Sequence, residues 1–189
     1  HVNATILPAG GADFFTAILQ SRGFSKRTTA SPPLDLRNHL MVCGSASESS
    51  RSFVDAAAAS WVCPMPDVVF AGTHGHEDIG AWRDAILELM HASRRAVIAI
   101  RQPAQPDRAE PLRKTIAEVV ARILAVAQPP TLLIEGGATA AAVFERLEWR
   151  TLKVEQQLAP GVVALRPMES PHQRLVLKPG SYPWPTGVA

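Results

Sequence analysis

Two consecutive glycines at a strand-to-helix junction are the residues of this chain best suited to bind a ligand. Gly136 and Gly137 follow the apolar, β-rich run Thr131–Ile134 and precede an alanine-rich segment with helical spacing. Glycine lacks a Cβ, so its backbone can approach a ligand closely, and the N–H groups that begin a helix favour an anion such as phosphate. Thr139 adds a hydroxyl donor to the same turn. Because Gly-Gly pairs also occur in ordinary tight turns, a phosphate site needs support from other segments.

Two further strand ends carry groups of similar chemistry. Gly44 and Ser45 follow the apolar run Leu40–Cys43, and both can donate hydrogen bonds to a phosphate or a ribose. Near the C-terminus another apolar run delivers Lys178, a positive charge suited to phosphate, and then Gly180. Ligands of open α/β sheets bind outside the carboxyl ends of the strands, where all three motifs lie. The sequence therefore predicts a nucleotide-phosphate site if the fold brings these ends together.

The order of these motifs resembles the nucleotide-binding C-terminal domain of the four-carbon acid sugar kinases. That family has, in order, Gly-Ser-x-Ser, Gly-Gly-(Asp/Glu)-Thr, Ala-Pro-Gly-Val and a final Lys-x-Gly. The corresponding segments here are Gly44–Ser47, Gly136–Thr139, Ala159–Val162 and Lys178–Gly180, and the match extends from about Pro8 to Tyr182.

The resemblance implies an ATP-binding domain whose intact enzyme phosphorylates a threonate, erythronate or oxo-tetronate type of substrate, with Mg²⁺ accompanying the nucleotide. The residues that it assigns to nucleotide binding are Ser45, Gly136, Gly137, Ala138, Thr139 and Gly180. Lys178 would offset phosphate charge, although the sequence does not show which way its side chain points. The acceptor-activating base would lie on the family's N-terminal acid-sugar domain, so the catalytic residue of the complete enzyme is unknown.

The chain departs from the family pattern at three points. Ala138 replaces the acidic residue of Gly-Gly-(Asp/Glu)-Thr, and Tyr182–Pro183 replaces Phe-Gly. The Asp-Asp motif of the family's N-terminal domain does not occur. Since the chain also begins with His1 rather than Met, we expect a fragment that binds nucleotide without turnover and that pairs with an acid-sugar domain of the same or a partner chain. A homodimer is also compatible with the pattern.

Two other functions stay open on the sequence alone. A non-catalytic module, for nucleotide sensing or protein interaction, would explain Ala138 and Pro183. An enzyme that holds a sugar phosphate in the same turn is the second alternative.

Composition limits the class of protein. Hydrophobic residues make up 47% of the 189 residues and charged residues 19%, which is typical of a globular cytoplasmic domain. The net charge of +2 does not indicate a nucleic-acid binder, and no apolar run is long enough for a membrane span. Cys43 and Cys63 lack metal-site spacing and are predicted to be buried, reduced thiols.

Strands and helices alternate along the chain. We expect an α/β fold with three layers: a mostly parallel sheet, mixed at its C-terminal edge, flanked by helices, forming one nucleotide-binding domain over residues 1–189. The expected strands are Leu40–Cys43, Val68–Ala71, Ala96–Ile100, Thr131–Ile134, Leu152–Val154, Val162–Leu165 and Leu175–Leu177. The expected helices are Asp13–Arg22, Glu48–Ser60, Ile79–Ala92, Glu110–Ala127 and Ala140–Leu147, with a linker at Ser25–Asn38 and a hairpin turn at Ser170–Gln173.

The segment Thr73–Asp78 contains His74 and His76 beside two carboxylates. His-x-His can coordinate Zn²⁺ or Mn²⁺, but no third ligand has a recognisable spacing, so we predict no metal site. The segment is then a polar loop before a helix, or its histidines line the nucleotide pocket.

Aromatic and basic side chains elsewhere have structural interpretations. Trp61, Trp82 and Trp149 are expected in the core, and Trp184 is expected to be exposed or to pack on a partner. Arg94–Arg95 is interpreted as a solvated helix end.

Overall fold

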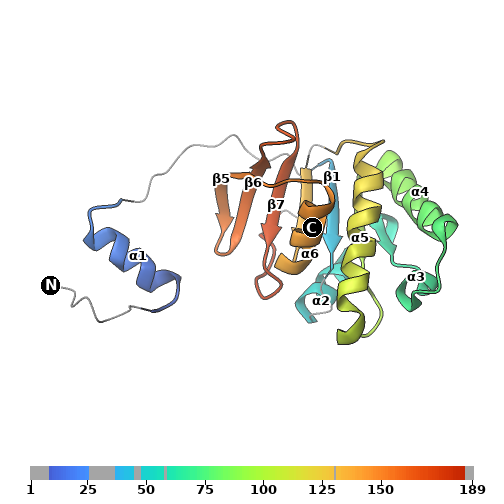
Figure 1. The fold of residues 1–189 in the computed structure, drawn as a ribbon, viewed down its shortest axis with the longest axis horizontal. Coiled ribbons are helices and arrows are strands. Elements are labelled where there is room, and N and C mark those ends of the chain that lie inside the picture. Colours follow the sequence, from blue (N-terminus) through green and yellow to red (C-terminus); the bar gives the residue numbers. More distant parts are fainter. Residues whose placement is uncertain (1–8, 26–36, 45–47, 58, 130, 186–189) are drawn as a thin grey trace. The chain divides into compact units, whose positions relative to one another are not determined.

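The computed structural model describes residues 9–25, 37–44, 48–57, 59–129 and 131–185 (Figure 1). The chain divides into two compact units, His1–Pro32 and Pro33–Ala189. The described part of the first unit contains the helix α1, Ala12–Ser21, close to the bounds that the sequence predicts. The linker predicted at Ser25–Asn38 lies mostly outside the described residues. That residues 1–189 form one nucleotide-binding domain stays a prediction.

The second unit is built on a sheet of seven strands in the order β2-β3-β1-β4-β7-β6-β5. Its strands are β1 (His39–Cys43), β2 (Val62–Pro64), β3 (Arg95–Ala99), β4 (Thr131–Glu135), β5 (Leu152–Ala159), β6 (Val162–Pro167) and β7 (Arg174–Lys178).

The sheet is parallel from β2 to β7 and antiparallel at the edge formed by β6 and β5. Every residue of β1 and β4 is buried, as expected of central strands that are covered on both faces. The antiparallel edge arises because no helix separates the last three strands, and Ser170–Gln173 makes the predicted turn between β6 and β7. The predicted α/β class, with a mostly parallel sheet that is mixed at its C-terminal edge, is confirmed.

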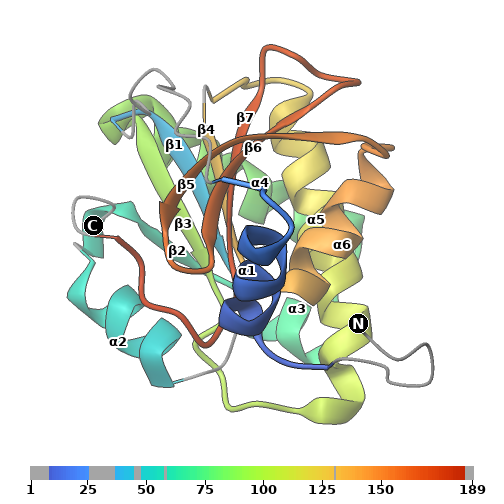
Figure 2. The ribbon, with the colours of Figure 1, turned by 90° about the vertical axis from the view of Figure 1, so that its left-hand side faces the viewer.

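Helices cover the two faces of the sheet unequally (Figure 2). One face packs against α3 (Asp67–Ala71), α4 (His76–Ser93), α5 (Ala109–Leu124) and α6 (Gly137–Arg146), which together form the larger core. The opposite face packs against α2 (Glu48–Ala56) and Trp184. The two cores remain separate because alternate residues of β1, such as Leu40 and Met41, point to opposite faces.

One predicted strand is wrong. Val68–Ala71 lies in helix α3, and the strand of this region is β2, Val62–Pro64. Pro66 precedes the helix with φ −60°, and Gly72 ends it in the left-handed conformation with φ 71°. These two terminators define one short helix, whereas the apolar run alone does not distinguish a buried strand from a buried helix.

Several helix bounds differ from those predicted. The helix predicted at Glu48–Ser60 ends at Ala56 and is followed by a short 3₁₀ turn at Ala59–Trp61. The helix predicted from Ile79 begins at His76, and the one predicted from Ala140 begins at Gly137. The second difference matters for function, because it places the double glycine at the start of α6 itself.

The tryptophans are mostly where the sequence places them. Trp82 and Trp149 are buried, while Trp61 is partly buried and packs under the guanidinium of Arg95, whose Cζ lies 3.9 Å from the ring centroid. The interpretation of Arg94–Arg95 as a solvated helix end is therefore wrong for Arg95, which begins β3. Arg94 does end α4, in a left-handed conformation with φ 61°.

Candidate functional site

The three strand ends with candidate binding residues are adjacent in the sheet. Cys43 at the end of β1 pairs in register with Glu135 at the end of β4, which pairs in turn with Lys178 at the end of β7. Gly44 and Gly136 directly follow the first two of these residues. The convergence that the sequence predicts therefore occurs at the carboxyl ends of neighbouring strands. Ser45 lies outside the described residues, so its proposed contact stays a prediction.

The connections that follow β1 and β4 leave these neighbouring strands on opposite faces of the sheet. The helix after β1, α2, packs on one face of the sheet, while the helix after β4, α6, packs on the other. Neighbouring strands whose following helices lie on opposite faces leave a crevice at their carboxyl ends, and open α/β sheets bind ligands there. Gly44 and Gly136 stand on either side of this position.

The backbone of the double glycine is arranged for an anion. Gly136 has φ 95° and is the N-cap of α6, and its N–H donates to the carbonyl of Lys178 at 2.8 Å. Gly137 and Ala138 form the exposed beginning of α6, which has no side-chain cap. The N–H groups of a first helical turn lack intrahelical acceptors. A Cβ built on Gly137 would meet no atom within 4 Å, so this side of the turn is open to a ligand.

Thr139 is buried rather than displayed. A Cβ built on Gly44 would lie 2.8 Å from Cγ2 of Thr139 and closer still to its Oγ1. Gly44 therefore lies against the first turn of α6 with no room for a side chain. This contact joins the two loops of the crevice, and the role of Thr139 as a hydroxyl donor to phosphate stays a prediction.

Lys178 points into the protein. Its side chain and that of Glu135 are almost completely buried, and its Nζ lies 3.2 Å from Oε1 of Glu135. The same Nζ donates to the carbonyls of Pro179, at 3.1 Å, and Tyr182, at 2.6 Å. The expectation that Lys178 offsets phosphate charge is wrong for this arrangement, because the ammonium group already neutralises a buried carboxylate.

Glu135 holds several elements together beneath the site. Ser50 of α2 donates its hydroxyl to Oε1, and the indole Nε1 of Trp184 donates to Oε2 at 3.2 Å. Trp184 also lies against Phe53, with ring centroids 6.2 Å apart, so this partly buried side chain packs on the domain itself. These contacts bind the segment after β7 to α2 and to the crevice. Sequence reasoning missed Glu135 and Ser50, although a glutamate within an apolar strand is a signal of a paired buried charge.

The Pro-Gly-Val motif has a structural role in the same region. Gly161 has φ 72° in the turn between β5 and β6, and a Cβ there would lie 3.0 Å from the ring of Tyr182. A glycine is needed at this position both for its left-handed backbone and for the aromatic ring above it. Gly180 lies in the segment that this packing supports.

Both cysteines are free and buried, in agreement with the predicted buried thiols. Burial raises the pKa of the Cys43 thiol far above its ordinary value, the carboxylate of Glu135 raises it further, and Lys178 opposes the change. Cys43 is therefore a neutral packing residue beside the ion pair rather than a nucleophile. Burial also raises the pKa of Cys63.

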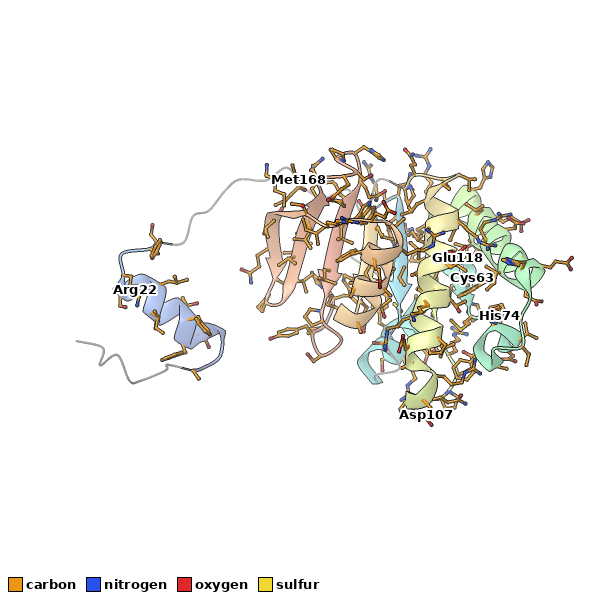
Figure 3. All side chains as sticks on the ribbon, in the orientation of Figure 1. Arg22, Cys63, His74, Asp107, Glu118 and Met168 are labelled. Carbon is orange, nitrogen blue, oxygen red and sulfur yellow. The ribbon has the colours of Figure 1, made fainter. Side chains whose placement is uncertain are left out.

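The histidine segment lies away from the glycine junctions. His74 and His76 line a cavity of about 430 Å³ with residues of α4 and α5, including Lys114 and Arg122. Nδ1 of His76 lies 3.3 Å from a guanidinium nitrogen of Arg122 (Figure 3 labels His74). Among the described residues no group of three or more His, Cys, Asp or Glu could hold a metal ion. The absence of a metal site stays a prediction, and the described lining of this cavity includes neither Gly44 nor the turn that begins α6.

A comparison with protein families decides the class of this arrangement. A family described as "Nucleotide-binding C-terminal domain" matches residues 40–182, from β1 past β7. The chain belongs to this family. The match contains the whole crevice, so the nucleotide-binding C-terminal domain that the motifs predict is confirmed, and its glycine junctions are the candidate nucleotide contacts.

Solved structures share the fold of this nucleotide-binding domain. A Haemophilus influenzae protein of the family DUF1537 superposes with a TM-score of 0.61 at 18% identity, covering 89% of this chain and 42% of that one. A DUF1537 protein of Bordetella bronchiseptica, solved with bound citrate as a domain-swapped dimer, gives 0.58 at 16% identity, covering 77% and 37%. A protein of Salmonella typhimurium LT2 gives 0.57 at 18% identity, covering 82% and 40%.

These identities show a common fold and nothing finer. The chain spans about two fifths of the length of the Haemophilus protein. A comparison with functionally curated proteins gives no match. Among the described residues, no helix has the length and apolar character needed to cross a bilayer.

Proposed function

We propose that this domain binds ATP across the crevice between β1 and β4, as the ATP-binding half of a four-carbon acid sugar kinase. The observation that carries the proposal is the contact of Gly44 with Thr139 beside the open first turn of α6. This contact joins the two glycine junctions at the crevice between β1 and β4. The family of the chain is described as nucleotide-binding.

Backbone N–H groups make most of the proposed phosphate contacts. The N–H groups of Gly137 and Ala138 would donate to the phosphate oxygens, while Gly136 provides the turn and the positive end of the α6 dipole faces the same oxygens. Ser45 and Gly180 would close the site from the loops after β1 and β7. Phosphoryl transfer depends on positioning and charge neutralisation, so this half of the enzyme supplies the positioned donor.

Mg²⁺ would enter with the nucleotide. Ala138 provides no carboxylate, and the carboxylate of Glu135 is already engaged by Lys178, Ser50 and Trp184. A magnesium ion that is held by substrate phosphates and water needs few protein ligands. We therefore assign no magnesium ligand to the described residues of the crevice.

The acceptor site and the general base belong, in this proposal, to an N-terminal acid-sugar domain of the same or a partner chain. The short span of this chain against its structural relatives supports such a partner, and the domain-swapped dimer of the Bordetella protein motivates a homodimer. The isolated chain would bind nucleotide without turnover. A cytoplasmic location completes the proposal, supported by two buried free thiols.

A second function is favoured by Ala138 and Pro183, which depart from the family motifs. A module that senses nucleotide, or that has lost nucleotide binding and serves protein interaction, would keep the fold and the buried Glu135–Lys178 pair. Only the first of these retains affinity for ATP, and neither supports phosphorylation when an acid-sugar domain is supplied.

Calorimetric titration with Mg-ATP tests the proposal on the parent and two matched variants of α6. Gly137→Val places two methyl groups where phosphate must approach the backbone, and we expect it to abolish binding. Ala141→Val adds a β-branched side chain at an exposed position of the same helix and serves as the control. Because a Cβ on Gly137 meets open space, both variants should fold. Unchanged ATP affinity in folded Gly137→Val would place the phosphate site elsewhere.

A further inference from the structure

A small apolar cavity lies beside the crevice, on the face of the sheet that is covered by α3 and α5. It has a volume of about 160 Å³, and its lining includes Gly44, Phe70, Ile100, Ala109 and Leu112. Gly44 follows β1 and Ile100 follows β3, so the cavity opens at the same carboxyl edge of the sheet as the glycine junctions. Its volume is several times that of one water, and its walls are mainly hydrocarbon.

Gly44 connects this cavity to the phosphate-binding turn. The residue lines the cavity and also packs against Thr139 in the first turn of α6. A ligand that crosses Gly44 would therefore have one end among apolar side chains and the other at the N–H groups of Gly137 and Ala138.

We propose that the cavity holds the purine base of the nucleotide. This inference rests on the proposed function, and it assigns the end of the ligand that the glycine motifs do not address. A flat heterocycle gains most from apolar walls that replace water on both of its faces. Gln105 and Arg113 are the lining residues with polar side chains that could reach the edge of a base.

A neighbouring cavity on the opposite face is a poorer site for a base. It has a volume of about 180 Å³, and its lining includes Arg51, Asp55 and Arg101. The guanidinium of Arg101 lies 3.9 Å from a carboxylate oxygen of Asp55. Burying an uncharged ring there would remove charged groups from water without supplying partners for them. The apolar cavity avoids this cost.

The test compares Mg-ATP with inorganic Mg-tripolyphosphate, which carries the phosphate chain without ribose or base. Ala109→Leu fills the cavity from the first residue of α5, where leucine is a good helix former. Ala141→Leu makes the same change at an exposed position of α6 and is the matched control. We expect Ala109→Leu to weaken the affinity for Mg-ATP at least about tenfold and to leave the affinity for tripolyphosphate unchanged. Ala141→Leu should change neither.

Photolabelling of the parent chain gives a second readout that needs no variant. An 8-azido-ATP probe carries its reactive group on the base, so the proposal expects labelled peptides to contain Phe70 or the segment 100–113. Labelling confined to α2 would overturn the inference. So would full ATP affinity in Ala109→Leu, or equal loss of ATP and tripolyphosphate in that variant. If the parent binds neither ligand, the proposed function itself fails and the base site fails with it.

Discussion

The ammonium of Lys178 and the carboxylate of Glu135 form a buried ion pair, 3.2 Å apart, and Glu135 directly precedes Gly136, the N-cap of α6. The two residues are neighbours in register at the ends of β7 and β4. Their side chains hold the segment after β7, through the carbonyl of Tyr182, and α2, through the hydroxyl of Ser50. The pair therefore links the segment after β7 to α2, and it does not contact the ligand in our proposal.

Removing one partner of this pair should destabilise the domain strongly. Lys178→Met leaves the carboxylate of Glu135 buried without its cation, and such losses cost about 3–5 kcal/mol. The double variant Lys178→Met/Glu135→Gln removes both charges and should recover part of that free energy, because the amide oxygen of glutamine can still accept from Trp184 while its NH2 group donates to the hydroxyl of Ser50. Urea unfolding of the parent, both single variants and the double variant measures the coupling. Strictly additive effects would show that the two side chains do not interact.

The sequence indicated the crevice but not what lies beneath it. Gly44 and Gly136 could be predicted to meet because apolar strands that precede glycine junctions end at a common edge of a parallel sheet. The inward direction of Lys178 could not be predicted, since a lysine at a strand end reaches solvent or a buried carboxylate depending on which strand lies beside it. Its partner Glu135 is 43 positions earlier in the chain and becomes a neighbour only through the β4–β7 pairing.

Local terminators explain the error at Val68–Ala71. The four residues are apolar and β-branched in part, which favours a strand. They form a helix instead because Pro66 and Gly72 stand at the two ends of a five-residue helix. Val69 and Phe70 are buried while Val68 is 44% exposed, a one-sided burial that suits a short surface helix. Tertiary packing against the sheet therefore overrode the strand propensity of this run.

Gly44 and Thr139 should show compensating effects on stability. Gly44→Ala places a methyl group into the side chain of Thr139, and overpacking of this kind costs about 1–3 kcal/mol. Thr139→Ala removes the two atoms that the new methyl group meets most closely, so the double variant should be more stable than Gly44→Ala alone. Thermal unfolding at matched conditions measures the three variants. A double variant that is no better than Gly44→Ala would contradict the contact.

The two glycines at the start of α6 should respond differently to alanine. Gly136 has φ 95°, a conformation that costs an L-residue about 1–3 kcal/mol, so Gly136→Ala should destabilise the domain. Gly137 is helical and its Cβ position is empty, so Gly137→Ala should be neutral or stabilising by up to about 1 kcal/mol. Denaturant unfolding compares the two directly. The reverse order of stability would mean that the positive φ has been assigned to the wrong glycine.

Glu155 makes stability depend on acidity at the antiparallel edge of the sheet. Burial alone would raise the pKa of this carboxyl, but hydrogen bonds from Arg166 and Arg174 outweigh it and hold the pKa below its ordinary value. Because the folded pKa is depressed, the stabilisation is complete above the unfolded pKa, at about 4.3, and is lost as pH falls through the folded value. Glu155→Gln should therefore cost about 1–3 kcal/mol at neutral pH.

The difference between Glu155→Gln and the parent should then shrink as the solution is acidified. Urea unfolding from pH 7 to pH 3 measures this convergence, with Glu88→Gln on the exposed surface of α4 as the control. Glu118, whose pKa is lowered by hydrogen bonds from Arg122 and Arg146, remains in both proteins and contributes equally to their acid sensitivity (labelled in Figure 3). If the difference in free energy of unfolding between the variant and the parent stays constant down to pH 3, the Glu155 carboxylate is not stabilised by its two arginines.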